Sequence, residues 1–145
     1  MNPRLPLAAV LAAAAALAAG CGAQAGSEVK SASFPDPERQ AVSAAVRDFS
    51  DAAGKRDYEQ ICSDYLAAPL VKRLDAAEGT SRCPDQLELS LRDVGETKLA
   101  VRNVRISGTN AVAIVQPTGT GDVEEQTRFA LVKEGPRWKL SGLAE

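Results

Sequence analysis

The sequence predicts an α+β domain in which N-terminal helices pack on a curved, four-stranded antiparallel sheet. Two patterns carry this prediction. Between residues 36 and 91, apolar side chains recur at the spacing of amphipathic helices. From residue 97 to residue 143, apolar and polar side chains alternate in short runs that are separated by turn-forming residues. Helices followed by a run of strands are typical of an α+β fold with the helices on one face of the sheet.

The first helix is expected over residues 37–54. Asp36 can cap its N-terminus, Pro37 suits the first helical position, and Gly54 can end it. Val46 and Phe49 lie on its apolar face. A strong start signal, a clear stop signal and a regular apolar face make this helix the best-defined element of the chain.

Shorter helices are expected between residues 57 and 91. Asp57 can cap the first of them, and Tyr58 and Tyr65 lie on its apolar face. The next helix is expected to start at Pro69 and the last to cover residues 83–91.

A change of phase marks the first predicted strand. Leu99 and Val101 alternate with polar residues, and Val104 and Ile106 alternate on the opposite parity. This shift around residues 102–103 predicts a β-bulge, which bends a sheet sharply. The remaining strands are expected at residues 111–115, 123–133 and 137–143, with turns between them.

Trp138 is the only tryptophan and lies on the closing strand. If helices cover the sheet, its ring should be buried against the first helix near Val46 and Phe49. The alternative is a position on the outer face of the sheet, where the ring would be available to a partner.

Arg4 is followed by an uncharged, alanine- and leucine-rich run that ends at Ala19-Gly20-Cys21. This pattern in the first 21 residues resembles a bacterial lipoprotein signal. The run is shorter than the roughly 20 apolar residues that span a bilayer. The resemblance implies a signal peptide at residues 1–20, lipidation at Cys21, and anchoring of an extracytoplasmic domain to the cell membrane. The alternative is an ordinary cleaved secretory signal.

Residues 21–35 are small and polar and are expected to form a flexible tether.

Composition excludes several classes of function. The net charge of the chain is −2, whereas a nucleic-acid-binding domain is expected to show a basic face. The chain has no histidine, so the commonest general base and a usual zinc ligand are missing. We therefore expect no metal, no cofactor and no catalytic residue.

Cys62 and Cys83 remain after Cys21 is assigned to the lipid. An exported protein meets an oxidising compartment, so the pair is expected to form a disulfide. The alternative is a metal site, for which two thiols without histidine are a poor ligand set.

Residues 36–145 resemble the NTF2-like superfamily. The resemblance rests on the opening helix with Val46 and Phe49, on the turn at residues 54–58, and on the closing hairpin at residues 129–140. It implies a long helix and two shorter ones lying in a strongly bent sheet that together form a cone.

The cone interior is where a site is expected. Tyr58 and Tyr65 are candidate cavity residues, and so are Glu125 and Thr127, which share strand parity with Phe129. An end-of-strand position in water is the alternative for Glu125.

The function that these observations favour is non-catalytic binding of an envelope protein or a small apolar ligand. The alternative function is a cone-cavity enzyme, an isomerase or hydrolase that uses carboxylate and tyrosine groups. A cone filled by Phe49, Phe129 and Trp138 would favour the binding protein.

Overall fold

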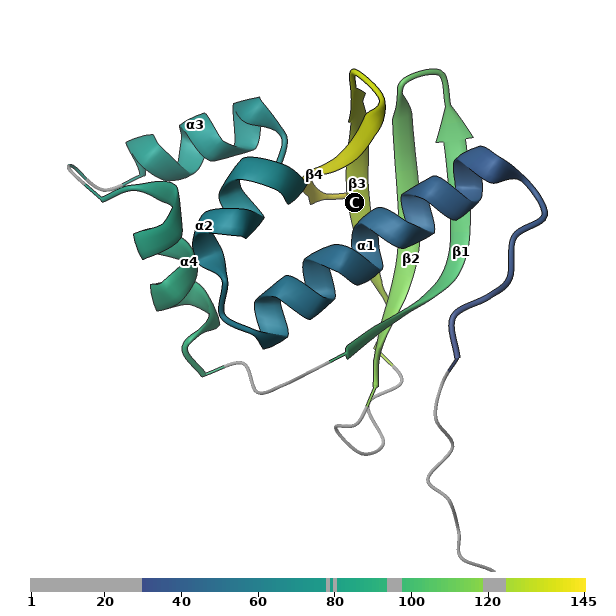
Figure 1. Cartoon of the computed structure of the whole chain (residues 1–145), viewed down its shortest axis with the longest axis horizontal. Helices are drawn as coiled ribbons and strands as arrows, with labels where there is room; N and C mark the ends of the chain where they lie inside the picture. The colour runs from purple at the N-terminus through teal and green to yellow at the C-terminus, as the bar shows by residue number, and fades with distance from the viewer. Residues whose placement is uncertain (1–29, 78, 80, 94–97, 119–124) are drawn as a thin grey trace, which may run out of the picture.

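A computed structural model describes residues 30–77, 79, 81–93, 98–118 and 125–145, so the predicted signal peptide and Cys21 lie outside the described residues. The described part contains four α-helices, one π-helical turn and a four-stranded sheet (Figure 1). The elements are α1 (Pro37–Gly54), α2 (Tyr58–Gln60), η1 (Ile61–Tyr65), α3 (Ala68–Ala76), α4 (Cys83–Leu91), β1 (Lys98–Ser107), β2 (Asn110–Thr118), β3 (Thr127–Glu134) and β4 (Arg137–Leu143). The predicted α+β class is confirmed.

The strands follow one another in the order β1-β2-β3-β4, each antiparallel to the next, and the sheet does not close on itself. The register between β1 and β2 shifts between Val101 and Asn103, which confirms the predicted bulge. A second shift lies between Ala130 and Leu131, in the pairing of β3 with β4. Both irregularities increase the local twist and bend of the strands.

The helices occupy two places around the sheet. The helix α1 crosses one face of it, whereas α2, α3 and α4 gather beside β4 (Figure 1). Between η1 and α3 the chain runs beside β4. Leu66 forms a parallel bridge with Leu140, and the Ala67 N–H donates to the Leu140 carbonyl at 2.8 Å. A short extended segment thus prolongs the sheet beyond β4 before α3 begins.

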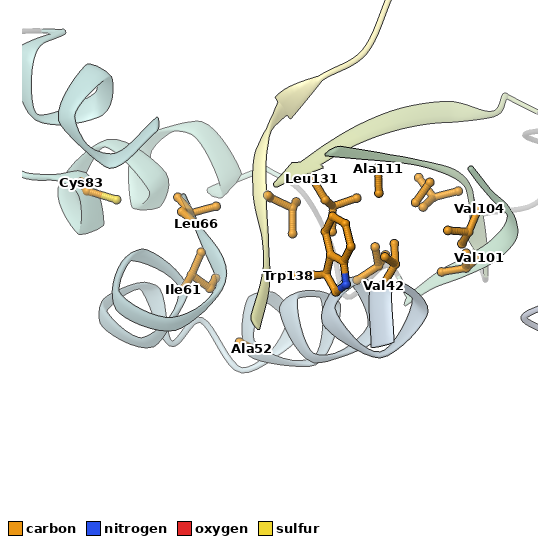
Figure 2. Packing of buried hydrophobic residues seen from close by; sticks show 14 residues of the cluster. Val42, Ala52, Ile61, Leu66, Cys83, Val101, Val104, Ala111, Leu131 and Trp138 are labelled. Carbon is orange, nitrogen blue, oxygen red and sulfur yellow. The ribbon is translucent and has the colours of Figure 1, made fainter. Parts of the chain in front are cut away.

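Trp138 is 4 % exposed and belongs to the same buried cluster as Val42 and Val46 of α1 and Leu131 of β3 (Figure 2). Phe49 packs against this cluster. The predicted core position of Trp138 is confirmed, and the outer-face alternative is excluded.

The N-terminus of α1 follows the sequence signals. The Asp36 carboxylate accepts a hydrogen bond from the Arg39 N–H at 3.0 Å, and Pro37 is the first helical residue. The C-terminal end differs in detail. Here Arg56, with φ 58°, adopts the left-handed conformation that reverses the chain, and Gly54 does not.

The end of the predicted tether is attached to the domain. The Ala32 N–H donates to the Val101 carbonyl at 2.7 Å, and the Val101 N–H donates to the Ser31 hydroxyl at 3.1 Å. The Gln40 amide donates to the Phe34 carbonyl at 2.7 Å. Residues 30–34 are therefore bound along β1 next to its bulge, which the polar composition of this segment does not indicate.

Glu38, in the first turn of α1, joins the helix to the β3–β4 hairpin. Its carboxylate accepts from Lys133 Nζ at 2.9 Å and from Trp138 Nε1 at 3.0 Å. Lys133 Nζ also lies 5.8 Å from the centre of the Trp138 ring. The Lys133 and Trp138 hydrogen bonds lower the pKa of Glu38 below its usual 4.5.

We expect Glu38→Gln to change how stability depends on pH. Because the folded state lowers the pKa of Glu38, the charged carboxylate contributes stability fully above the usual value of 4.5. This contribution disappears as the pH falls through the lowered pKa of Glu38 in the folded state. The variant should therefore be less stable than the wild type at neutral pH and equal to it in acid. Urea unfolding at several pH values measures the free energy of unfolding of both proteins.

Glu88→Gln is the matched control, since Glu88 is exposed on α4 and no hydrogen bond or ion pair joins it to another described residue. A wild-type advantage over Glu38→Gln that does not change with pH would contradict the assigned role of the charge.

Candidate functional site

A groove of about 450 Å³ lies where α1, η1 and the start of β4 meet. Its volume falls in the range of about 300–1,000 Å³ that is usual for ligand-binding clefts. Three elements that are distant in sequence contribute its walls. The lining residues are Ala41, Ala44, Ala45, Asp48, Asp64, Tyr65, Pro136, Arg137 and Trp138.

The floor of the groove exists because α1 carries small side chains there. Ala44 and Ala45 follow Ala41 by three and four residues and so lie on its face of the helix, with Asp48 one turn further along. Methyl groups at these positions leave open the space that larger apolar side chains would fill.

The π-helical turn η1 brings Tyr65 to the groove. The Leu66 N–H donates to the Ile61 carbonyl at 3.0 Å, which spans five residues. Turns of this kind are frequent at functional sites. Tyr65 packs against the core while lining the groove.

The charges around Tyr65 are mainly negative. Burial raises the pKa of Tyr65, and the neighbouring carboxylates of Asp48 and Asp64 raise it further. The phenol is therefore protonated at neutral pH and can donate a hydrogen bond, whereas phenolate chemistry is disfavoured.

Arg137 and Asp64 form an ion pair at 3.6 Å at the rim, with side chains 67 % and 41 % exposed. Ion pairs this open to water contribute at most about 1 kcal/mol to stability. Asp48 is exposed, and no hydrogen bond or ion pair joins it to another described residue. The groove thus contains one carboxylate with an ion-pair partner, Asp64, and one without a partner among the described residues, Asp48.

The four candidate cavity residues do not come together. Tyr65 lines the groove, while Glu125 and Thr127 line a separate depression of about 500 Å³ beside Leu143. Glu125 is exposed because β3 begins only at Thr127, later than the strand expected from residue 123. Tyr58 packs against the core and lines neither space.

Aromatic side chains pack between α1 and the sheet. The rings of Phe49 and Phe129 are partly buried and meet edge to face, with centroids 6.1 Å apart. Both pack against the core cluster that contains Trp138.

Cys62 and Cys83 form the predicted disulfide, with their Cα atoms 6.2 Å apart. The Asp75 carboxylate accepts from the Cys83 N–H at 2.7 Å and so ties α3 to the start of α4.

Among the described residues, no group of three or more potential metal ligands comes together. Within the same ranges, no helix has the length and apolarity to cross a membrane.

Sequence reasoning left out two residues of the groove as functional residues. Asp48 lies off the apolar stripe of α1 and Arg137 lies on the closing strand, so periodicity alone marks neither as a functional residue. The run of alanines on one face of α1 was the available signal, since it marks a face that no bulky residue fills.

The fold and the groove define a small, disulfide-linked α+β domain with aromatic side chains packed in and against its core and an open, acidic, partly aromatic groove on its surface. No protein family, curated protein or solved structure matches the chain.

Proposed function

We propose that the chain is a lipid-anchored, extracytoplasmic domain that binds a protein partner or a small apolar ligand at the cell envelope without catalysis. The observation that carries this proposal is the aromatic packing of Phe49, Phe129 and Trp138 in and against the core. The surface groove at Tyr65 is the proposed place for recognition, and an open groove suits binding better than it suits reactions that must exclude water.

The anchor is proposed from the lipobox-like junction at Cys21. The Cys62–Cys83 disulfide supports an oxidising compartment, since such bonds persist mainly in exported proteins. Two acyl chains on Cys21 would be sufficient for stable attachment.

An NTF2-like cone is proposed as the finer description of the fold. Its support is a long helix across one face of a sheet that carries bulges in β1 and in the β3–β4 pairing (Figure 1). The grouping of α2, α3 and α4 beside β4 is compatible with short helices closing one end of such a cone.

The second candidate function is an enzyme, and one observation favours it. Asp48 and Asp64 flank Tyr65, so two carboxylates and a protonated phenol meet in one groove. We place this function second because the groove is open and Asp48 is exposed to solvent.

We expect an anchored binding protein to lose both its location and its contacts when the lipid site is removed. A photo-cross-linking residue, p-benzoylphenylalanine, replaces Ala41 at the exposed edge of the groove. In intact cells it should yield a cross-linked product in the membrane fraction. Cys21→Ser should release the protein from that fraction, or leave it unprocessed, and abolish the product.

The same photo-reactive residue at Arg47 is the control, because Arg47 is exposed on α1 and lines a different space of about 180 Å³. A Cys21→Ser protein that is cleaved and still fractionates like the wild type would refute the anchor. Equal products from positions 41 and 47 would refute the groove as the binding site.

A further inference from the structure

We propose that the groove between α1, η1 and β4 receives an arginine side chain from an extended segment of a partner protein. This inference rests on the proposed binding function and names the chemistry of the partner. It follows from the shape of the groove, from its apolar surface, and from the one carboxylate in it that has no partner.

The apolar surface fits the aliphatic part of such a side chain. The methyl groups of Ala44 and Ala45 form the floor, and the Tyr65 ring stands beside them. Long cationic side chains bury their methylene stems along apolar surface and keep the charged end near water. An open groove with a methyl floor and a charged rim matches both requirements.

The charge at the rim selects a cation. Asp64 already has Arg137 as its partner at 3.6 Å, whereas Asp48 has no partner among the described residues. Asp48 and Asp64 both act on the groove, because besides burial both raise the pKa of Tyr65, and Arg137 opposes them in part. An incoming cation would pair with Asp48 and relieve this field.

Arginine fits better than lysine. Its planar guanidinium stacks on aromatic rings and pairs with a carboxylate through two parallel hydrogen bonds, whereas lysine offers a compact point charge. An aromatic side chain, Tyr65, and a carboxylate without a partner among the described residues, Asp48, line the same groove. A neutral apolar ligand would use the floor and leave Asp48 without a role.

The test is an NMR titration of the purified protein with N-acetyl-arginine amide. N-acetyl-citrulline amide, which has nearly the same shape without the charge, and N-acetyl-leucine amide are the comparison probes. The arginine probe should shift the signals of Ala44, Ala45, Tyr65 and the Trp138 indole. Asp48→Asn should weaken its binding about 2–5-fold, as expected for one exposed ion pair. Asp51→Asn should not, because Asp51 lies on the same helix outside the groove.

Each outcome decides the matter. Preference for arginine over citrulline that is lost in Asp48→Asn and kept in Asp51→Asn establishes the proposal. Equal binding of the arginine and citrulline probes overturns the proposal. Binding of the leucine probe alone also overturns it. In both cases the groove remains a binding site, but not one for arginine. Absence of shifts at the groove with all three probes overturns the inference. The cross-linking experiment at position 41 then decides separately whether the proposed function stands.

Discussion

Trp138→Ala should lower the free energy of unfolding by about 3–5 kcal/mol, the usual loss when a large buried aromatic residue is truncated. Trp138 is 4 % exposed and sits where β4, β3 and α1 meet. Because domains of this size have a total stability of about 5–15 kcal/mol, the variant should lose a large part of its stability and unfold at a much lower urea concentration. Urea unfolding followed by far-UV circular dichroism measures the loss without relying on the missing indole.

Trp138→Phe tests how much of this loss a smaller aromatic ring recovers. It keeps a six-membered ring in the core and removes part of the indole together with the Nε1–H that donates to Glu38 at 3.0 Å. If packing dominates, this variant should lose less than half as much stability as Trp138→Ala. A Trp138→Ala protein within about 1 kcal/mol of the wild type would mean that the ring is not part of a tightly packed core.

Removing the disulfide should have the second-largest effect. Cys62 and Cys83 are 21 residues apart, and closing a loop of this length restricts the unfolded chain by about 3 kcal/mol. The double variant Cys62→Ser with Cys83→Ser should lose about that much stability, and a reducing agent should bring the wild type to the same value. Non-reducing mass spectrometry should also recover the two linked peptides from the wild-type protein.

The loss of stability without the disulfide should be greatest in one part of the fold. Hydrogen exchange should quicken first in α4, because the disulfide and the Asp75–Cys83 hydrogen bond attach this helix to its neighbours. Protection in α1, which packs in the main core, should change less. Uniform loss of protection across both helices would contradict a local role for the bond.

Local signals predicted those parts of the fold that short-range chemistry controls. Asp36 and Pro37 set the start of α1, since capping and the proline ring act within one turn. The phase change at residues 102–103 located the β1 bulge, because alternation must slip by one residue where an extra residue is inserted. Burial of Trp138 followed from its alternation with Leu140 on the closing strand, whose inward side chains share the core cluster with α1.

The site was predicted less well, because its residues come from separate elements. The π-helical turn places Tyr65, yet its hydrogen bond from Leu66 to Ile61 has no sequence signature of its own. Pairing of Ala67 with Leu140 directs the chain away from the sheet face and toward the side of β4. Strand parity made Glu125 a candidate cavity residue, with a position in water as the alternative. The strand begins at Thr127, and Glu125 is exposed.

The sequence by itself determined the order of helices and strands, the bulge in β1 and the pairing of Cys62 with Cys83. These depend on periodicity, on caps and on the count of cysteines, all of which are local or compositional. Only the tertiary structure decided that Phe49 and Phe129 pack against each other and that Asp48, Tyr65 and Arg137 share a groove. The physical reason is that both results depend on how α1, η1 and β4 pack against one another, and periodicity within each element cannot specify such contacts between distant segments.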